Sequence, residues 1–320
     1  MAQPKGYQTS VVMYDEDSYG QDPSSPSGVK LYHKSGVTVG VTQALEQREY
    51  VGGGRTELAH IQGPKDAGGA LPVELSAESI GKLLKHALGT VNTTGTGPYV
   101  HTITIGALPE GFTLEKDFGA NITTGRYEKI NGCRINAMNV EFTGNGKPTV
   151  SFDIIGANGS FVDAPLDATP DDNGSTPFSV VEWSLEEGGS AISIVTAGKF
   201  SIANDLDASN GYAAGAGGVR TSLEEGKAKV TGEITARFTD ITLLNKAVNG
   251  TSSSMKLIMT RGTGAGSAGN EYLEFEIASL KFSRKSPEIS GPAGMMITLG
   301  FMADGTNALK AVLKNAVATL

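Results

Sequence analysis

The chain carries the stretch Leu83-Leu84-Lys85-His86-Ala87-Leu88-Gly89-Thr90, and about 160 residues later it carries Leu243-Leu244-Asn245-Lys246-Ala247-Val248-Asn249-Gly250-Thr251. Further segments resemble each other at nearly the same spacing and in the same order: 49–56 with 211–221, 130–132 with 289–291, and 142–146 with 301–305. Self-similarity at one spacing is typical of a duplicated structural unit. The sequence therefore predicts two tandem copies of one unit.

Both copies have the pattern of β-structure. In the segment 272–282 apolar residues alternate with glutamates, which is the period of two expected of a half-buried strand. Other predicted strands are rich in β-branched and aromatic residues, and they cover 99–105, 135–142, 149–155, 229–238, 255–259 and 295–301. We expect a mainly β protein built of two tandem, related β-sandwich or half-barrel domains.

A short helix is predicted on the flank of each domain. In the first, Ser76 serves as the N-terminal cap, apolar residues recur with helical spacing over 80–88, and Gly89 supplies the left-handed C-terminal residue. The second runs from the cap Asp240 to Gly250. A third amphipathic helix is predicted over 307–318.

The charge distribution adds an internal boundary. All of the formal net charge of -8 falls between 148 and 198, where eight acidic residues occur without any Lys or Arg. Residues 157–178 in this stretch are dense in Gly, Pro, Asp and Ser, a composition typical of loops. We expect an N-terminal arm (1–28), a first domain (29–156), an acidic linker (157–178) and a second domain (179–320).

Composition excludes several classes of protein. The 320 residues contain no apolar run of the ~18 to 20 residues that a membrane span needs, and the N-terminus has no apolar signal region. The single cysteine, Cys133, excludes an internal disulfide framework and a multi-cysteine zinc site. The acidic balance disfavours tight binding to a nucleic-acid backbone.

No motif predicts catalysis, a cofactor or a metal. Residues 264–269 satisfy the dinucleotide-binding glycine pattern, but a strand pattern follows them, so we interpret them as a hairpin loop. The acidic segment 167–174 lacks the ligand spacing of a calcium loop. The histidines lack partners at metal-ligand spacing and lie far apart, at His33, His60, His86 and His101. Cys133 has no histidine nearby in the sequence. We therefore expect no enzyme activity.

The order of these weak strand and turn patterns resembles the major tail tube proteins of long-tailed bacteriophages. The resemblance rests on 69–89, 99–104 and 108–115 in the first half, and on 226–240 and 280–291 in the second. The opening Ser18-Tyr19-Gly20-Gln21-Asp22-Pro23 is also similar to that family. The likeness extends from about Asp15 to Asn315, and the acidic linker is its least covered part.

The resemblance implies a structural virion protein that forms stacked rings, the conduit for genome delivery. Its implied partners are further copies of itself, the tape-measure protein and double-stranded DNA in the lumen, the tail terminator and distal tail proteins, with or without a sheath. No membrane is implied. It also implies location in the virion tail after assembly in the host cytoplasm. With two tube domains per chain, three chains would complete a ring of approximate six-fold symmetry; without a true duplication, six chains would.

Two glycine-rich segments, 46–69 and 207–226, are candidates for contacts between rings. Within them we expect Tyr50, Arg55, Tyr212 and Arg220 to contact a neighbouring ring. Two alternatives remain open from the sequence. One is another all-β self-assembling capsid-associated or surface protein, and the other is a carbohydrate-binding β-sandwich module.

Overall fold

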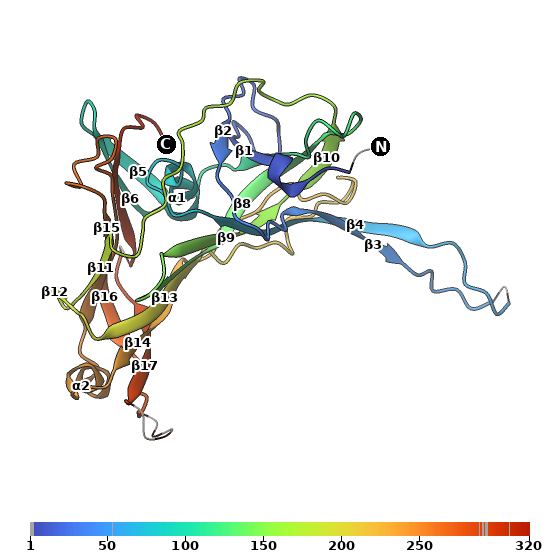
Figure 1. Cartoon of the computed structure of the whole chain (residues 1–320). Helices are drawn as coiled ribbons and strands as arrows, with labels where there is room; N and C mark the ends of the chain where they lie inside the picture. The colour runs from blue at the N-terminus through green and yellow to red at the C-terminus, as the bar shows by residue number, and fades with distance from the viewer. Residues whose placement is uncertain (1–2, 53, 288, 290, 292–293, 307) are drawn as a thin grey trace.

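The computed structural model describes residues 3–52, 54–287, 289, 291, 294–306 and 308–320. In this part of the chain, strands dominate and two short α-helices accompany them (Figure 1). The elements of the first half are β1 (Ser10–Asp15), β2 (Val29–Leu31), β3 (Gly40–Glu46), β4 (Ile61–Val73), α1 (Gly81–Leu88), β5 (Gly89–Thr94), β6 (Tyr99–Ile105), β7 (Phe112–Asp117), β8 (Tyr127–Thr143), β9 (Thr149–Gly156) and β10 (Asn158–Val162). Those of the second half are β11 (Trp183–Glu187), β12 (Ser190–Ala191), β13 (Val195–Ala203), β14 (Lys229–Arg237), α2 (Thr242–Asn249), β15 (Ser253–Thr260), β16 (Tyr272–Phe282), β17 (Met296–Ala303) and β18 (Lys310–Asn315). The expected mainly β class is confirmed.

The strand pairings of the first half recur in the second. All are antiparallel, and β1–β2, β1–β7, β3–β4 and β4–β9 correspond to β11–β12, β11–β15, β13–β14 and β14–β17. Likewise β7–β8, β8–β9 and β8–β10 correspond to β15–β16, β16–β17 and β16–β18. The β5–β6 hairpin is the addition that distinguishes the first half. The fold therefore repeats one topology, with β8 and β16 as counterparts.

A shared register irregularity supports this correspondence. The β7–β8 pairing shifts between Phe112 and Leu114, where it reaches Ile130 of β8. The β15–β16 pairing shifts between Ser253 and Met255, where it reaches Ile277 of β16. A bulge adds one residue to one strand and re-aims the residues beyond it. Because the bulge occurs at corresponding positions, β8 and β16 match in their local register as well as in their order of partners.

The two halves are joined edge to edge. Strand β8 pairs with β13 from Thr143–Ala197 to Ala137–Ala203, and β6 pairs with β18. One continuous hydrophobic core runs through both halves and includes Phe152, Phe200 and Phe275. Alternation of buried and outward residues along β9 and β15 builds this core, since neighbouring strand residues face opposite sides of the sheet.

Both predicted flanking helices are present, with a correction at each N-terminal cap. Helix α2 begins at Thr242 and its cap position is Ile241, so Asp240 lies one residue earlier than a cap, although its carboxylate accepts a hydrogen bond from Thr242 N. Gly89 and Gly250 end the two helices with positive φ, at 104° and 62°, as glycine permits. Ser76 does not cap α1: the helix begins at Gly81, and the Ser76 carbonyl accepts a hydrogen bond from Ile80 N in the preceding turn. The error arose because a buried turn at 76–80 continues the helical spacing of the apolar residues upstream.

The predicted third helix over 307–318 is wrong, although Asn307 itself lies outside the described residues. Residues 310–315 form β18, which lies between β16 and β6. Ala311, Leu313 and Asn315 are buried in alternation. Long-range pairing on both edges outweighs the local helical spacing, because it satisfies every backbone group of a buried segment.

The sequence repeat is correct for the helices but not for 142–146 with 301–305. Phe142 lies on β8, whereas Phe301 lies on β17, the counterpart of β9. The match of 130–132 with 289–291 includes Ser290, which lies outside the described residues. Strands of similar composition follow one another in each half, so short matches can slip by one strand.

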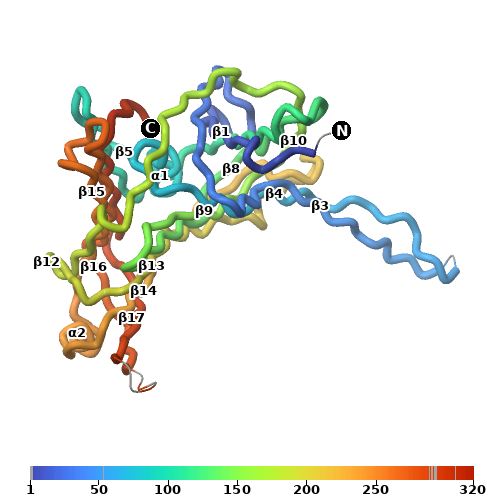
Figure 2. Tube along the Cα trace, viewed as in Figure 1, coloured from blue at the N-terminus to red at the C-terminus, as the bar shows by residue number. Residues whose placement is uncertain are grey.

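The segment expected as an N-terminal arm contains β1, whose Val11, Met13 and Tyr14 are buried. The segment expected as an acidic linker begins with β10 and continues across the top of the molecule and down along α1, as the yellow-green trace in Figure 2 shows. Its Asp171 forms a parallel bridge with Val29 of β2. The division into domains stays a prediction.

Candidate assembly surfaces

The β3–β4 hairpin projects far beyond the body of the molecule (Figure 1). Its outer part exposes large apolar side chains that a folded monomer ordinarily buries: Leu45, Tyr50, Val51, Leu58 and Ile61. Exposed apolar patches of this kind mark surfaces that contact another protein. The projection and its composition together make the hairpin a candidate contact arm.

A loop of the second half clamps the base of this hairpin. The Arg220 guanidinium donates to the backbone oxygens of Gly156 (2.9 Å) and Ala208 (3.0 Å), and it pairs with the Asp66 carboxylate at 2.5 Å. The Tyr212 hydroxyl donates to the Lys65 carbonyl at 2.7 Å. The 207–226 segment is therefore ordered within the chain and fixes the direction in which the hairpin leaves the body.

The four predicted inter-ring residues thus fall into two pairs. Tyr50 and Arg55 are exposed on the outer part of the hairpin, with Tyr50 at 65 % exposure. Arg220 is 7 % exposed, and it stacks over the Tyr212 ring at 4.9 Å. The contact role of all four stays a prediction, but a substitution of Arg220 would act first on the hairpin base.

Two sheet edges form a second candidate surface. Strands β3, β4, β9, β8, β13, β14, β17 and the end of β16 follow one another side by side. Among the described residues, β3 has a strand partner on one edge only, and the end of β16 pairs with β17 while its other edge has no strand partner beyond Leu280. Unpaired backbone groups at a sheet edge are templates for pairing with another chain.

One face of this sheet is polar and turned away from the core. Across three neighbouring strands, Glu141, Lys199 and Glu233 stand in one row, and the Lys199 ammonium lies 3.2 Å from Glu233. Small polar residues continue the face on either side, among them Asn139, Ser151, Ser201, Thr231 and Thr235. The row carries two carboxylates for one ammonium.

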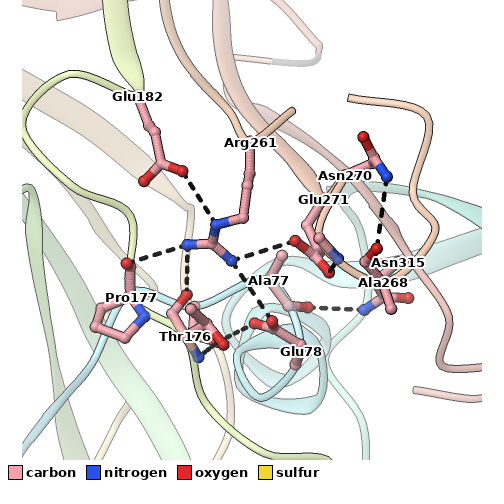
Figure 3. Close-up of polar contacts among 12 residues, drawn as sticks. Ala77, Glu78, Thr176, Pro177, Glu182, Arg261, Ala268, Asn270, Glu271 and Asn315 are labelled. Carbon is pink, nitrogen blue, oxygen red and sulfur yellow. Dashed lines mark hydrogen bonds and ion pairs between the residues drawn. The ribbon is translucent and has the colours of Figure 1, made fainter. Parts of the chain in front are cut away.

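The acidic segment 157–178 and the residues that follow it are held to the rest of the chain by specific bonds. Arg261 gathers three carboxylates around its guanidinium, at 3.0 Å from Glu182, 3.2 Å from Glu271 and 3.6 Å from Glu78 (Figure 3). The same group donates to the carbonyls of Thr176 (2.9 Å) and Pro177 (3.1 Å). This cluster fastens the segment between α1 and the β15–β16 loop.

A few residues earlier in the same segment, Asp172 contacts the first half. It accepts hydrogen bonds from Tyr32 and Lys30, which lower the pKa of its carboxyl. The bond from the Tyr32 hydroxyl also raises the pKa of Tyr32 to about 12. Asp167 accepts backbone hydrogen bonds from Thr169 and Gly28, which lower its pKa. The carboxylates therefore order the segment, although several remain exposed to solvent.

His101 and Cys133, two of the residues considered for catalysis, are buried. His101 is fully buried and bonded to Thr93 and to the Val317 carbonyl. Burial raises the pKa of the Cys133 thiol, which disfavours the reactive thiolate. Residues 264–269 form the loop between β15 and β16, as predicted. Within the described ranges, no His, Cys, Asp and Glu side chains form a group of three that could hold a metal.

A model of the phage tail tube protein family matches residues 6–303. The chain belongs to this family. No curated protein matches the sequence. Membership means that this tail tube protein has a structural role in the virion tail, where tube proteins self-assemble with other tail components. In the part of the chain that the structure describes, no helix is long and apolar enough to cross a membrane.

The sequence pointed to 46–69 as a contact segment through its glycine-rich composition, and it led us to expect open strand edges in each half, but it did not show which strands carry those edges. An edge depends on which strands pair across the whole molecule, and no local pattern records that. The exposed apolar residues within 40–61 were the available signal for the arm, since alternation there does not produce a buried face.

Proposed function

We propose that three copies of this tail tube protein close into one ring, and that stacked rings form the conduit for the genome. The observation that carries the proposal is the edge-to-edge joining of two topologically equivalent halves through β8 and β13. The same joint between chains would bring the end of β16, counterpart of β8, against the segment around β3, counterpart of β13. Three chains then supply six tube domains with approximate six-fold symmetry.

Ring closure would remove the two exposed sheet edges. In a lone chain these edges are a hazard for uncontrolled association, whereas a closed ring pairs them. The ring would then present the row Glu141–Lys199–Glu233 on its inner wall. A wall with excess carboxylate repels phosphate and lets a duplex slide.

The remaining parts of the proposal derive from the tube role. The protein acts as a structural subunit without catalytic activity and assembles in the host cytoplasm. The tape-measure protein occupies the lumen before the DNA, and the tail terminator and distal tail proteins contact the two ends of the tube. The exposed arm, with Tyr50 and Arg55, contacts the next ring.

Electron microscopy of the concentrated, purified chain tests the stoichiometry. End-on class averages should show a central channel with six similar lobes, and native mass spectrometry of the same sample should give three chains per ring. Six chains per ring would contradict the proposed use of the duplication. Shells or sheets without a channel would favour another self-assembling virion protein.

A further inference from the structure

Helices α1 and α2 occupy corresponding places in the two halves, yet their surroundings differ. Leu84 and Leu88 of α1 are 0 % and 1 % exposed. On and beside α2, Val248 is 46 % exposed and Ile241 is 57 % exposed, while Leu243 is buried. Helix α1 is therefore covered on both faces, whereas α2 is covered on one face only.

The second half of the chain covers α1. Gly81 lies so close to the Leu320 side chain that an added Cβ would collide with its methyl group, and that Cβ would be in tight contact with Leu313. At the helix C-terminus, the Asn204 amide donates to the Ala87 carbonyl at 3.0 Å. At the other end, the Asn315 amide donates to the Ala77 carbonyl at 2.7 Å. The β8–β13 joint thus includes a helix contact.

Helix α2 has no such cover from its own chain among the described residues. Its buried face packs on β16, and its Lys246 ammonium bonds to Glu187 at 2.7 Å. Figure 1 shows α2 at the periphery, far from α1 and from the β3–β4 arm. In a closed ring, the neighbour of the second half is the first half of another chain.

We propose that the face of α2 with Ile241 and Val248 docks against the first half of a second copy of this chain, on the surface that includes Phe161. The proposal rests on the ring proposed above. Phe161 lies on β10, the counterpart of the β18 strand that covers α1, since both strands pair with corresponding ends of β8 and β16. It is 65 % exposed. The exposed face of α2 is thus the counterpart of α1, and the exposed Phe161 surface is the counterpart of β18. Within the chain, α1 and β18 are already in contact.

The substitution Val248→Lys in the full-length protein tests this docking. Because Val248 is already half exposed, the variant should unfold at the same denaturant concentration as the wild type, while its threshold concentration for ring formation should rise at least about tenfold. Val181→Lys is the matched control, since Val181 is 86 % exposed and lies outside α2 and β10. The control should assemble like the wild type.

A cysteine pair tests the partner surface. Val248→Cys combined with Phe161→Cys should give disulfide-linked chains on oxidation of assembled protein, and neither single variant should, since native Cys133 is buried. Wild-type assembly with equal ring formation by the Val248→Lys variant would overturn the docking but leave the ring proposal intact. Rings of that variant that only fail to stack would assign the face to another ring and also overturn it. Absence of rings from the wild type itself would overturn the ring proposal, and the docking with it.

Discussion

The guanidinium of Arg220 joins segments from both halves of the chain at the base of the hairpin. It is buried, and it donates hydrogen bonds to the carbonyl oxygens of Ala208 and Gly156. Arg220→Ala should therefore reduce the free energy of unfolding by about 2 kcal/mol, because charged hydrogen bonds to buried groups are lost. Urea denaturation measures this.

Arg55→Ala is the matched control for that substitution. Arg55 is exposed on the outer part of the hairpin, so its removal should change stability by no more than about 0.5 kcal/mol. Equal destabilisation by both substitutions would contradict the assigned clamp at the hairpin base.

His86 makes the stability of the chain depend on pH. Burial lowers the pKa of its imidazole, although the Asp15 carboxylate at 2.9 Å opposes the shift and Lys82 and Lys85 add to it. Well above pH 6.5 the ring is neutral in both states. Below it, the unfolded chain takes up a proton that the folded chain resists, so stability falls as the pH is lowered.

His86 should lower the stability between pH 7.5 and 5.5 by at most about 1.4 kcal/mol, the limit set by an unfolded-state pKa of about 6.5. In His86→Gln this part of the pH dependence should vanish, whatever the cost of the substitution at neutral pH. Denaturation curves of both proteins at the two pH values measure the difference. A variant with the wild-type pH dependence would show that another group carries it.

At the scale of elements, the hairpin arm has a separable role. Tyr50→Ser combined with Arg55→Ala removes an exposed aromatic ring and a charge from its outer part without touching the base. Rings should still form, because these residues lie far from the clamp, but tubes should become shorter or fail to form. Electron microscopy distinguishes isolated rings from tubes, and normal tubes would exclude the arm residues as inter-ring contacts.

Elements with their own periodicity were predictable from the sequence. Strand β16 and the two helices have local spacings that agree with their final burial, so residues 272–282 and the cores of both helices were assigned correctly. Residues 310–315 were not, because β18 exists through its neighbours β16 and β6. For the same reason, the sequence did not reveal the contacts of Arg220 at the hairpin base, because its partners Asp66 and Gly156 are far from it in the sequence.

The polar row of the sheet bears on how the whole tube treats DNA. Glu141→Lys with Glu233→Lys would turn two carboxylates and one ammonium into three ammonium groups per row. If the row lines the lumen, assembled variant tubes should bind double-stranded DNA at low salt and release it as salt is raised, because phosphate contacts release counterions. Wild-type tubes should not bind. Filter binding across salt concentrations measures this, and equal binding by both would place the row elsewhere.

The closure of the whole ring is testable through its expected register. Within the chain Ala203 pairs with Ala137. The counterpart of Ala203 on the hairpin edge is Thr42. The counterpart of Ala137 beyond β16 is Ser283, which extends the pairing by donating its N–H to the Gly300 carbonyl at 2.8 Å. Thr42→Cys with Ser283→Cys should therefore form disulfides between chains.

The length of the cross-linked ladder then reports the number of chains in the ring. Under non-reducing conditions, three chains per ring would give bands that end at the trimer, because the third bond closes the circle. Six chains would extend the ladder to the hexamer. Ala137→Cys with Ala203→Cys serves as the control, since that pair should close within one chain. Rings that form without any cross-link between chains would show that these two edges do not meet, and the internal joint would then not be the template for the external one.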